Sequence, residues 1–158
     1  VIRGPETTRE RMLEINAAAV ILERELVVRE VESRAGVRRA LIALAEAGVD
    51  ALWVPPDRTA LTAGGYRAIT EEARRRHLPL LVDTQNMVEA GGLFSMVPDP
   101  EAMGQQAARM VNTLLAGGDV PRPQDPERLL VVMNARTLEA GELTFDRMLF
   151  DFVDRVVE

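Results

Sequence analysis

The stretch Val49-Asp50-Ala51-Leu52-Trp53-Val54-Pro55-Pro56-Asp57-Arg58-Thr59 decides the fold class of this 158-residue chain. Its first half is an apolar run without alternation, which is typical of a parallel strand covered by helices on both faces. The two prolines then end the strand, because proline cannot donate a hydrogen bond to a sheet. The three polar residues that follow therefore lie beyond the carboxyl end of the strand, where open α/β sheets bind ligands. Trp53, inside the apolar run, is expected in the core.

The sequence on both sides of this stretch alternates between strand and helix patterns. Helices are predicted from a Thr7 or Thr8 cap to about residue 23, over 35–47, from Thr59 to Arg76, from the Asp99-Pro100 cap to Gly117, over 134–140 and, as a C-terminal amphipathic helix, over 145–156. Strands are predicted at 25–31, 78–82, 93–97 and 129–133. Within the third helix, Gly64 and Gly65 would weaken the interior. The alternation predicts an α/β fold, a doubly wound and mostly parallel sheet of Rossmann-like form.

Composition excludes several classes of function. The net charge is −6, which argues against a nucleic-acid partner, and no apolar run is long enough to span a membrane. All 19 basic residues are arginine, so a phosphate-binding or Schiff-base lysine is impossible. A single histidine, His77, and the absence of cysteine exclude a histidine-dependent triad and thiolate or multi-histidine metal sites. These absences remove much of enzyme chemistry.

Polar residues follow two of the expected strands at the same edge of the sheet. Asp57, Arg58 and Thr59 come after one strand, and Asp83-Thr84-Gln85 comes after the next. Arg58 could recognise a carboxylate through its planar guanidinium, or it could be a solvated surface residue. Two alternatives concern local structure: Asp57 and Thr59 would cap the following helix, and Thr84 would only form a turn.

The opening stretch also carries a family resemblance. V-D-A-L-W-V-P-P-D-R-T resembles the "VDAIYVPTDNT" segment of the substrate-binding proteins of ABC transporters, of the tryptophan/tyrosine-binding type. Further similar segments keep the order and spacing of the family over nearly the whole chain: 1–6 with "VIYNPSE", 78–84 with "IPLFAGDT", 91–106 with "GALAALGVDYYELGRQ", 114–121 with "ILKGEKPADIP" and 132–144 with "YVNLKAAKALGLTI".

The resemblance implies a periplasmic-binding-protein type I fold, in which two α/β lobes hold a small solute in a cleft and present it to a membrane permease. Residues 1–158 resemble the second lobe alone, with the N-terminal lobe missing. Segment 93–116 resembles the βα unit that crosses to the other lobe, and 117–128 the return crossover. The resemblance implies a periplasmic or extracellular lipoprotein that is not an enzyme and needs no cofactor. The ligand-binding positions implied are Glu6, Thr7, Asp57, Arg58, Thr59, Asp83, Thr84 and Gln85.

Departures from the family pattern bear on the ligand. Arg58 replaces the asparagine of "DNT", and Pro100 and Glu101 replace tyrosines common after the aspartate at position 99. The ligand is thus expected to be an amino acid or another anionic solute, with an aromatic amino acid less well supported.

Other functions and assemblies remain open alternatives. The same fold serves as the ligand-sensing domain of regulators and membrane sensors, and a small enzyme of flavodoxin or receiver type is a third possibility. Without the other lobe, the strand at 93–97 is expected to lack neighbours. The unit 93–116 would then either extend the edge of the sheet or pair with the same unit of a second copy, which would give a homodimer.

Overall fold

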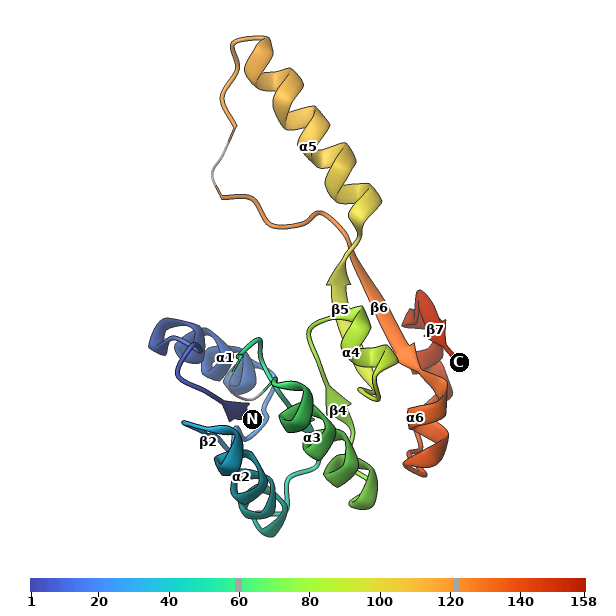
Figure 1. Cartoon of the computed structure of the whole chain (residues 1–158). Coiled ribbons are helices and arrows are strands. Elements are labelled where there is room, and N and C mark those ends of the chain that lie inside the picture. Colours follow the sequence, from blue (N-terminus) through green and yellow to red (C-terminus); the bar gives the residue numbers. More distant parts are fainter. Residues whose placement is uncertain (59–60, 121–122) are drawn as a thin grey trace.

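The structure is a computed structural model that describes residues 1–58, 61–120 and 123–158 (Figure 1). The helices are α1 (Arg9–Ile21), α2 (Arg34–Glu46), α3 (Ala63–Arg75), α4 (Gln85–Glu89), α5 (Pro100–Leu115), α6 (Ala135–Ala140) and the 3₁₀ helix η1 (Arg147–Phe152). The strands are β1 (Ile2–Arg3), β2 (Arg29–Glu30), β3 (Leu52–Trp53), β4 (Leu80–Leu81), β5 (Phe94–Pro98), β6 (Leu129–Asn134) and β7 (Arg155–Val157).

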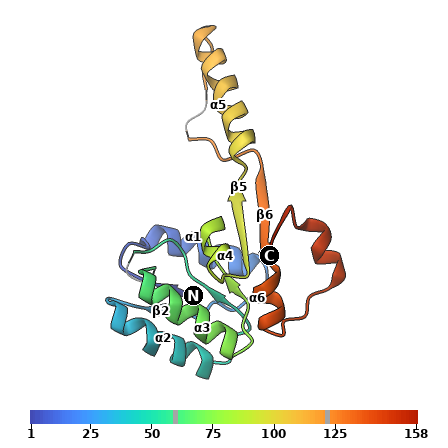
Figure 2. The ribbon, with the colours of Figure 1, turned by 45° about the vertical axis from the view of Figure 1, so that its right-hand side comes forward.

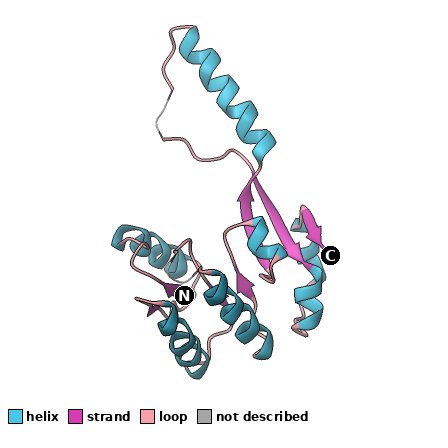
Figure 3. Ribbon diagram, viewed as in Figure 1, coloured by secondary structure: helices cyan, strands magenta, loops and turns pink. Residues whose placement is uncertain are grey.

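The strands form a pair and a five-stranded sheet. β1 pairs with β2, and the larger sheet has the order β3-β4-β5-β6-β7. Every pairing is parallel except the one between β5 and β6. Helices α2 and α3 pack against each other (Figure 3). The predicted α/β class with a mostly parallel sheet is confirmed.

The core lies between the short strands and helices α2 and α3. Its fully buried members are aliphatic and include Ile2, Val31, Val37, Leu41, Leu44, Leu52, Val54, Ile69, Leu80, Val82, Val88 and Val132. Because these side chains exclude water, their burial supplies most of the favourable free energy of folding. Trp53 is only partly buried, so its predicted place in the core is wrong; its side chain lies in the wall of a hollow.

Helix caps follow the sequence closely at four positions. Thr8, Thr84 and Asn134 each accept a hydrogen bond from a backbone N–H in the first turn of the helix that follows. Asp99 caps α5 through the backbone N–H groups of residues 101 and 102, at 2.9 and 3.4 Å. These donors have no partner within the helix, so the cap residues set where each helix begins.

The third helix begins later than predicted. Its first residue is Ala63, and the Thr62 hydroxyl accepts a hydrogen bond from the Gly65 backbone N–H at 3.1 Å. Thr59, the predicted first residue, lies outside the described residues. Gly64 and Gly65 therefore lie in the first turn, not in the helix interior, and the expected weakening there does not apply.

Two further predictions are corrected at the edges of the fold. Of the strand predicted at 25–31, only Arg29 and Glu30 pair, because β1 is equally short. The predicted C-terminal helix over 145–156 is instead η1 followed by β7, which pairs in parallel with β6. The β-branched Val156 and Val157 extend the sheet there, which suits their conformational preference.

Helix α5 stands apart from the rest of the molecule. Figures 1 and 2 show it at the far end of β5 and β6, which run from the sheet as an antiparallel pair. The expectation that the strand at 93–97 has no neighbours is wrong, since β5 pairs with both β4 and β6. Among the described helices, none is long and apolar enough to cross a membrane.

Candidate functional site

Asp57 joins the loops that follow β1 and β3. Its Oδ2 accepts hydrogen bonds from the backbone N–H groups of Glu6 (3.0 Å) and Thr7 (3.3 Å), and the Thr7 hydroxyl lies at 3.5 Å. The residue is only 3% exposed. A buried carboxylate held by backbone N–H groups braces two loops strongly. The N-cap of the next described helix, α3, is Thr62.

Gly4 makes this brace possible. A Cβ atom at Gly4 would lie 2.1 Å from Oδ1 of Asp57, far inside van der Waals contact. This role was not predicted from the sequence, although a glycine directly after a strand is a recognisable sign that another group approaches the backbone closely.

Arg58 and Glu6 form an ion pair at the surface of the braced loops. The Arg58 backbone N–H donates to Glu6 Oε2 at 3.0 Å, and the Arg58 Nε lies 3.5 Å from Oε1. Their side chains are 91% and 46% exposed. An ion pair so exposed is weak, because water competes for both partners. The edge of the sheet thus presents one cation and one anion that a solute can reach.

Asp83 lies beyond β4, the neighbour of β3. Burial raises the pKa of its carboxyl group, whereas hydrogen bonding from the Trp53 side chain and the charge of Arg11 lower it. Its Oδ2 is buried and has no hydrogen-bond partner among the described residues. This carboxyl group therefore has unused hydrogen-bonding capacity. The sequence singled out Asp83, but it missed Trp53 and Arg11 as its neighbours.

Thr84 and Gln85 open α4. The Thr84 hydroxyl accepts from the Met87 backbone N–H at 3.3 Å, which fits the alternative reading of Thr84 as a local structure former. The Gln85 amide donates to Glu89 at 2.7 Å and accepts from Arg155 at 2.9 Å. Both ends of that amide are therefore engaged within the lobe.

The structure brings together part of the predicted site. One hydrogen-bonded group contains Glu6, Thr7, Asp57 and Arg58, and the pairing of β3 with β4 places Asp83 at the end of the neighbouring strand. The loops after β1, β3 and β4, together with the start of α4, are called the rim below. Thr59 lies outside the described residues. Among the described residues, no group of three or more acidic or histidine side chains could hold a metal ion.

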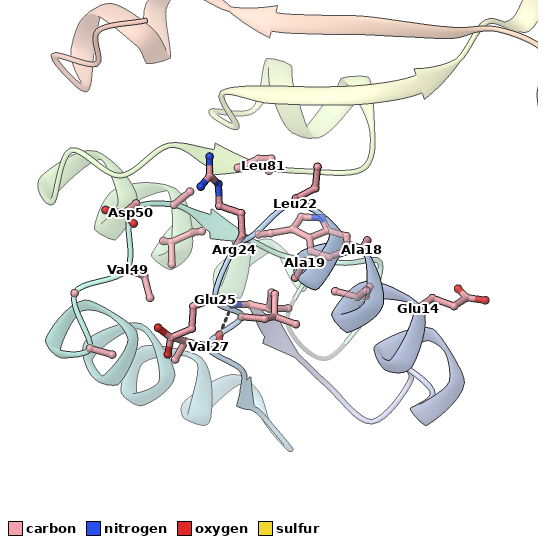
Figure 4. A pocket seen from close by; sticks show the side chains of 18 of the residues that line it. Glu14, Ala18, Ala19, Leu22, Arg24, Glu25, Val27, Val49, Asp50 and Leu81 are labelled. Carbon is pink, nitrogen blue, oxygen red and sulfur yellow. Dashed lines mark hydrogen bonds between the residues drawn. The ribbon is translucent and has the colours of Figure 1, made fainter.

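A separate hollow of about 710 Å³ lies between α1 and the strands (Figure 4). Its wall is mainly apolar, with Ala18, Ala19 and Leu22 on one side and Val49 and Leu81 among its other members. No predicted site residue within the described chain lines it. Arg11 and Trp53 do line it, and both act on the Asp83 carboxyl group, so the hollow adjoins the surroundings of Asp83.

Comparisons with known proteins place this geometry in a family. The family model described as "ABC transporter substrate binding protein" matches residues 6–152. A comparison with curated proteins finds no match.

Solved structures share the fold at low sequence identity. The ligand-free, open structure of CD0873 from Clostridium difficile, a substrate-binding protein with adhesive properties, has a TM-score of 0.81 and 16% identity, and the match covers 99% of this chain and 52% of that one. A conserved domain protein from Vibrio cholerae has a TM-score of 0.71 and 22% identity, and the match covers 99% of this chain and 53% of that one. The ABC domain from Streptococcus pneumonia in complex with L-Trp has a TM-score of 0.72 and 22% identity, with the same two coverages of 99% and 53%.

The chain thus spans about half the length of these solved proteins. Their likeness shows the fold, and the family model covers nearly the whole sequence. This chain belongs to the ABC transporter substrate-binding protein family.

Proposed function

We propose that the chain is one lobe of the solute-binding component of an ABC transporter, and that its rim forms one wall of a cleft that captures a small molecule. The observation that carries this proposal is the exposed pair of Arg58 and Glu6 on loops braced by Asp57. A rigid base with accessible charges suits solute recognition, because little ordering is needed on binding. The role is binding, not catalysis.

The isolated position of α5 supports a second lobe. Several large side chains of α5 are exposed, among them Met103, Val111, Leu114 and Leu115, the last at 81%. Such a stripe is costly to leave in water. We assign segment 93–116 to the other lobe and 117–128 to the return crossover, so that α5 packs on the other lobe.

The charges of the rim favour an amino acid or another anionic solute. The Arg58 guanidinium offers two donors to a carboxylate, and Glu6 offers an acceptor to a cationic group. Asp83 contributes a carboxyl oxygen with free hydrogen-bonding capacity. Thr7, Thr59, Thr84 and Gln85 complete the proposed wall, with Gln85 available only if its contacts to Glu89 and Arg155 open.

The first prediction tests this wall. In the full two-lobed protein, Arg58→Ala should weaken binding of the true solute by about 1.5–3 kcal/mol, the loss of a charge-assisted hydrogen bond. Calorimetry with a panel of amino acids, peptides and organic acids measures the effect. Arg67→Ala, an exposed arginine on α3, is the control and should leave affinity unchanged. Equal affinity in the Arg58 variant would refute the role of Arg58.

We further propose that the two-lobed protein works outside the cytoplasmic membrane, in the periplasm or at the cell surface, and delivers its solute to an ABC permease. Family membership supports this proposal. Reconstitution with the cognate permease tests it: transport that does not depend on the protein would contradict it.

A further inference from the structure

Helix α5 with its N-cap Asp99 and the described parts of the returning segment, 116–120 and 123–128, form a unit with its own internal contacts, here called the α5 unit. The buried Gln106 amide donates to the Asp125 carbonyl at 2.9 Å and to the Gln124 side chain at 3.3 Å. The Glu127 backbone N–H donates to Gln106 Oε1 at 3.3 Å, and Arg109 forms an ion pair with Glu127. The unit is therefore held together without the rest of the lobe.

A two-stranded ribbon connects the α5 unit to the sheet. β5 and β6 pair from Phe94↔Met133 to Pro98↔Leu129, but β4 pairs only with Phe94 and β7 only from Val132 onward. Within the part of the chain that the structure describes, residues 95–98 and 129–131 thus have no third strand beside them. Two-stranded ribbons twist more freely than wider sheets, so the angle of the α5 unit needs a further restraint to be fixed.

One side chain spans this ribbon. The Arg128 guanidinium lies 3.5 Å from Oδ2 of Asp99 and 3.5 Å from Oδ1 of Asp154. Asp99 is the N-cap of α5, and its backbone N–H donates to the Arg128 carbonyl at 3.0 Å. Asp154 belongs to the sheet, since it exchanges hydrogen bonds with Val131 at 2.8 and 3.0 Å.

We propose that Arg128 is a clasp that sets the angle of the α5 unit relative to the sheet, by joining Asp99 on the unit to Asp154 on the lobe. The Arg128 side chain is 60% exposed, whereas those of Asp99 and Asp154 are 12% and 34% exposed, so water reaches the cation and the clasp restrains the angle without locking it. Arg155, the neighbour of Asp154, donates to Gln85 at the rim, so the clasp ends beside the candidate site. If α5 packs on a second lobe, the clasp governs how far the cleft opens; this last step rests on the proposed function.

The absence of cysteine allows a direct test on this chain alone. Cysteines introduced by Arg67→Cys on α3 and Ala108→Cys on α5, both exposed positions, carry spin labels for pulsed dipolar spectroscopy. The doubly labelled parent should give one narrow distance distribution. Arg128→Met and Asp154→Asn should each lose that single narrow peak, and 1 M salt should broaden it in the parent because screening weakens exposed pairs.

The matched control is Arg109→Met, which removes an ion pair inside the α5 unit and leaves the clasp intact. Its distribution should match the parent. A narrow peak in Arg128→Met, or equal broadening in Arg109→Met, would overturn the clasp. Circular dichroism melting confirms that each variant is folded. No solute is involved, so failure of this test is independent of failure of the solute-binding proposal.

Discussion

At the scale of single residues, Gly4 shows how closely the loop after β1 approaches the Asp57 side chain. The second prediction is that Gly4→Ala destabilises the fold by about 1–3 kcal/mol, since the new Cβ would displace the Asp57 carboxylate from its backbone donors. Gly104→Ala is the control: nothing lies within 4 Å of a Cβ there, and alanine favours the helix by roughly 1 kcal/mol. Urea unfolding measures both. A neutral Gly4 variant would contradict the brace.

Asp83 provides a test by pH. Burial raises the pKa of its carboxyl group, so the folded state binds the proton more tightly than the unfolded state does. Folding stability from this group is therefore full below the unfolded pKa of about 3.9 and falls as pH rises through the folded value. The third prediction is that Asp83→Asn loses less stability than the parent between pH 4 and pH 7. Unfolding free energies at the two pH values decide; parallel changes in both proteins would refute it.

Some residues of this site could be predicted from the sequence, and others could not. Asp57, Arg58 and Asp83 could be found because each follows an apolar strand run, a signal local in sequence. The partners Gly4, Arg11 and Trp53 could not, because their roles depend on which loops and strands become neighbours. Trp53 reads as core in an apolar run, yet it lies beside a hollow that only the packing of α1 creates.

At the scale of elements, Tyr66 links α3 to α4 and to the turn after α4. Its hydroxyl donates to the Met87 carbonyl, and burial raises its pKa to about 12, whereas a backbone hydrogen bond with Gly92 lowers it. The folded state thus favours the neutral phenol, and stability falls as pH rises from about 10, the unfolded value, toward 12. The fourth prediction is that Tyr66→Phe loses less stability than the parent between pH 9 and pH 11. At pH 7 its free energy of unfolding should be about 1 kcal/mol lower than that of the parent, because the hydroxyl hydrogen bond is lost.

Thermal melts across that pH range measure the difference. Tyrosine ionisation, followed by absorbance, should move to lower pH on unfolding. An identical alkaline loss in Tyr66→Phe would assign the effect to other groups.

Elements with local signals were predicted well, and those fixed by tertiary contacts were not. The Asp99-Pro100 start of α5 and the left-handed Gly117 after it, at φ 79°, follow from capping chemistry. The start of α3 and the strand β7 do not. A threonine at 59 and one at 62 are equivalent as caps in sequence, and an apolar C-terminus becomes a strand only because the edge of β6 is free to pair.

At the scale of the whole molecule, the rim forms one of the two walls of the proposed cleft. The fifth prediction is that residues 1–158 bind the solute at least about ten-fold more weakly than the two-lobed protein, because a cleft buries most of a small ligand and one wall cannot exclude water from Arg58. Calorimetry on both proteins in one buffer measures this. Equal affinity would mean that this chain holds the entire site.

The family and the mostly parallel α/β sheet could be predicted from ordered segments across the chain, whereas the neighbours of β5 and the position of α5 in space could not. The amphipathic stripe of α5 indicates burial, but sequence alone does not say against what. In the described part of the chain, Met103, Val111 and Leu114 of this stripe stay exposed.

The excursion of the chain through the α5 unit has a consequence for the order in which the fold assembles. The hydrogen bonds described for Asp57 join it to Glu6 and Thr7, so this brace can form while only the N-terminal part of the chain is ordered. β5, in contrast, cannot complete its pairing until β6 arrives, and residues 99–128 separate the two strands. Until then one edge of β5 is unpaired and the apolar face of α5 is exposed, which makes this the stage of folding at which the chain is most prone to aggregate.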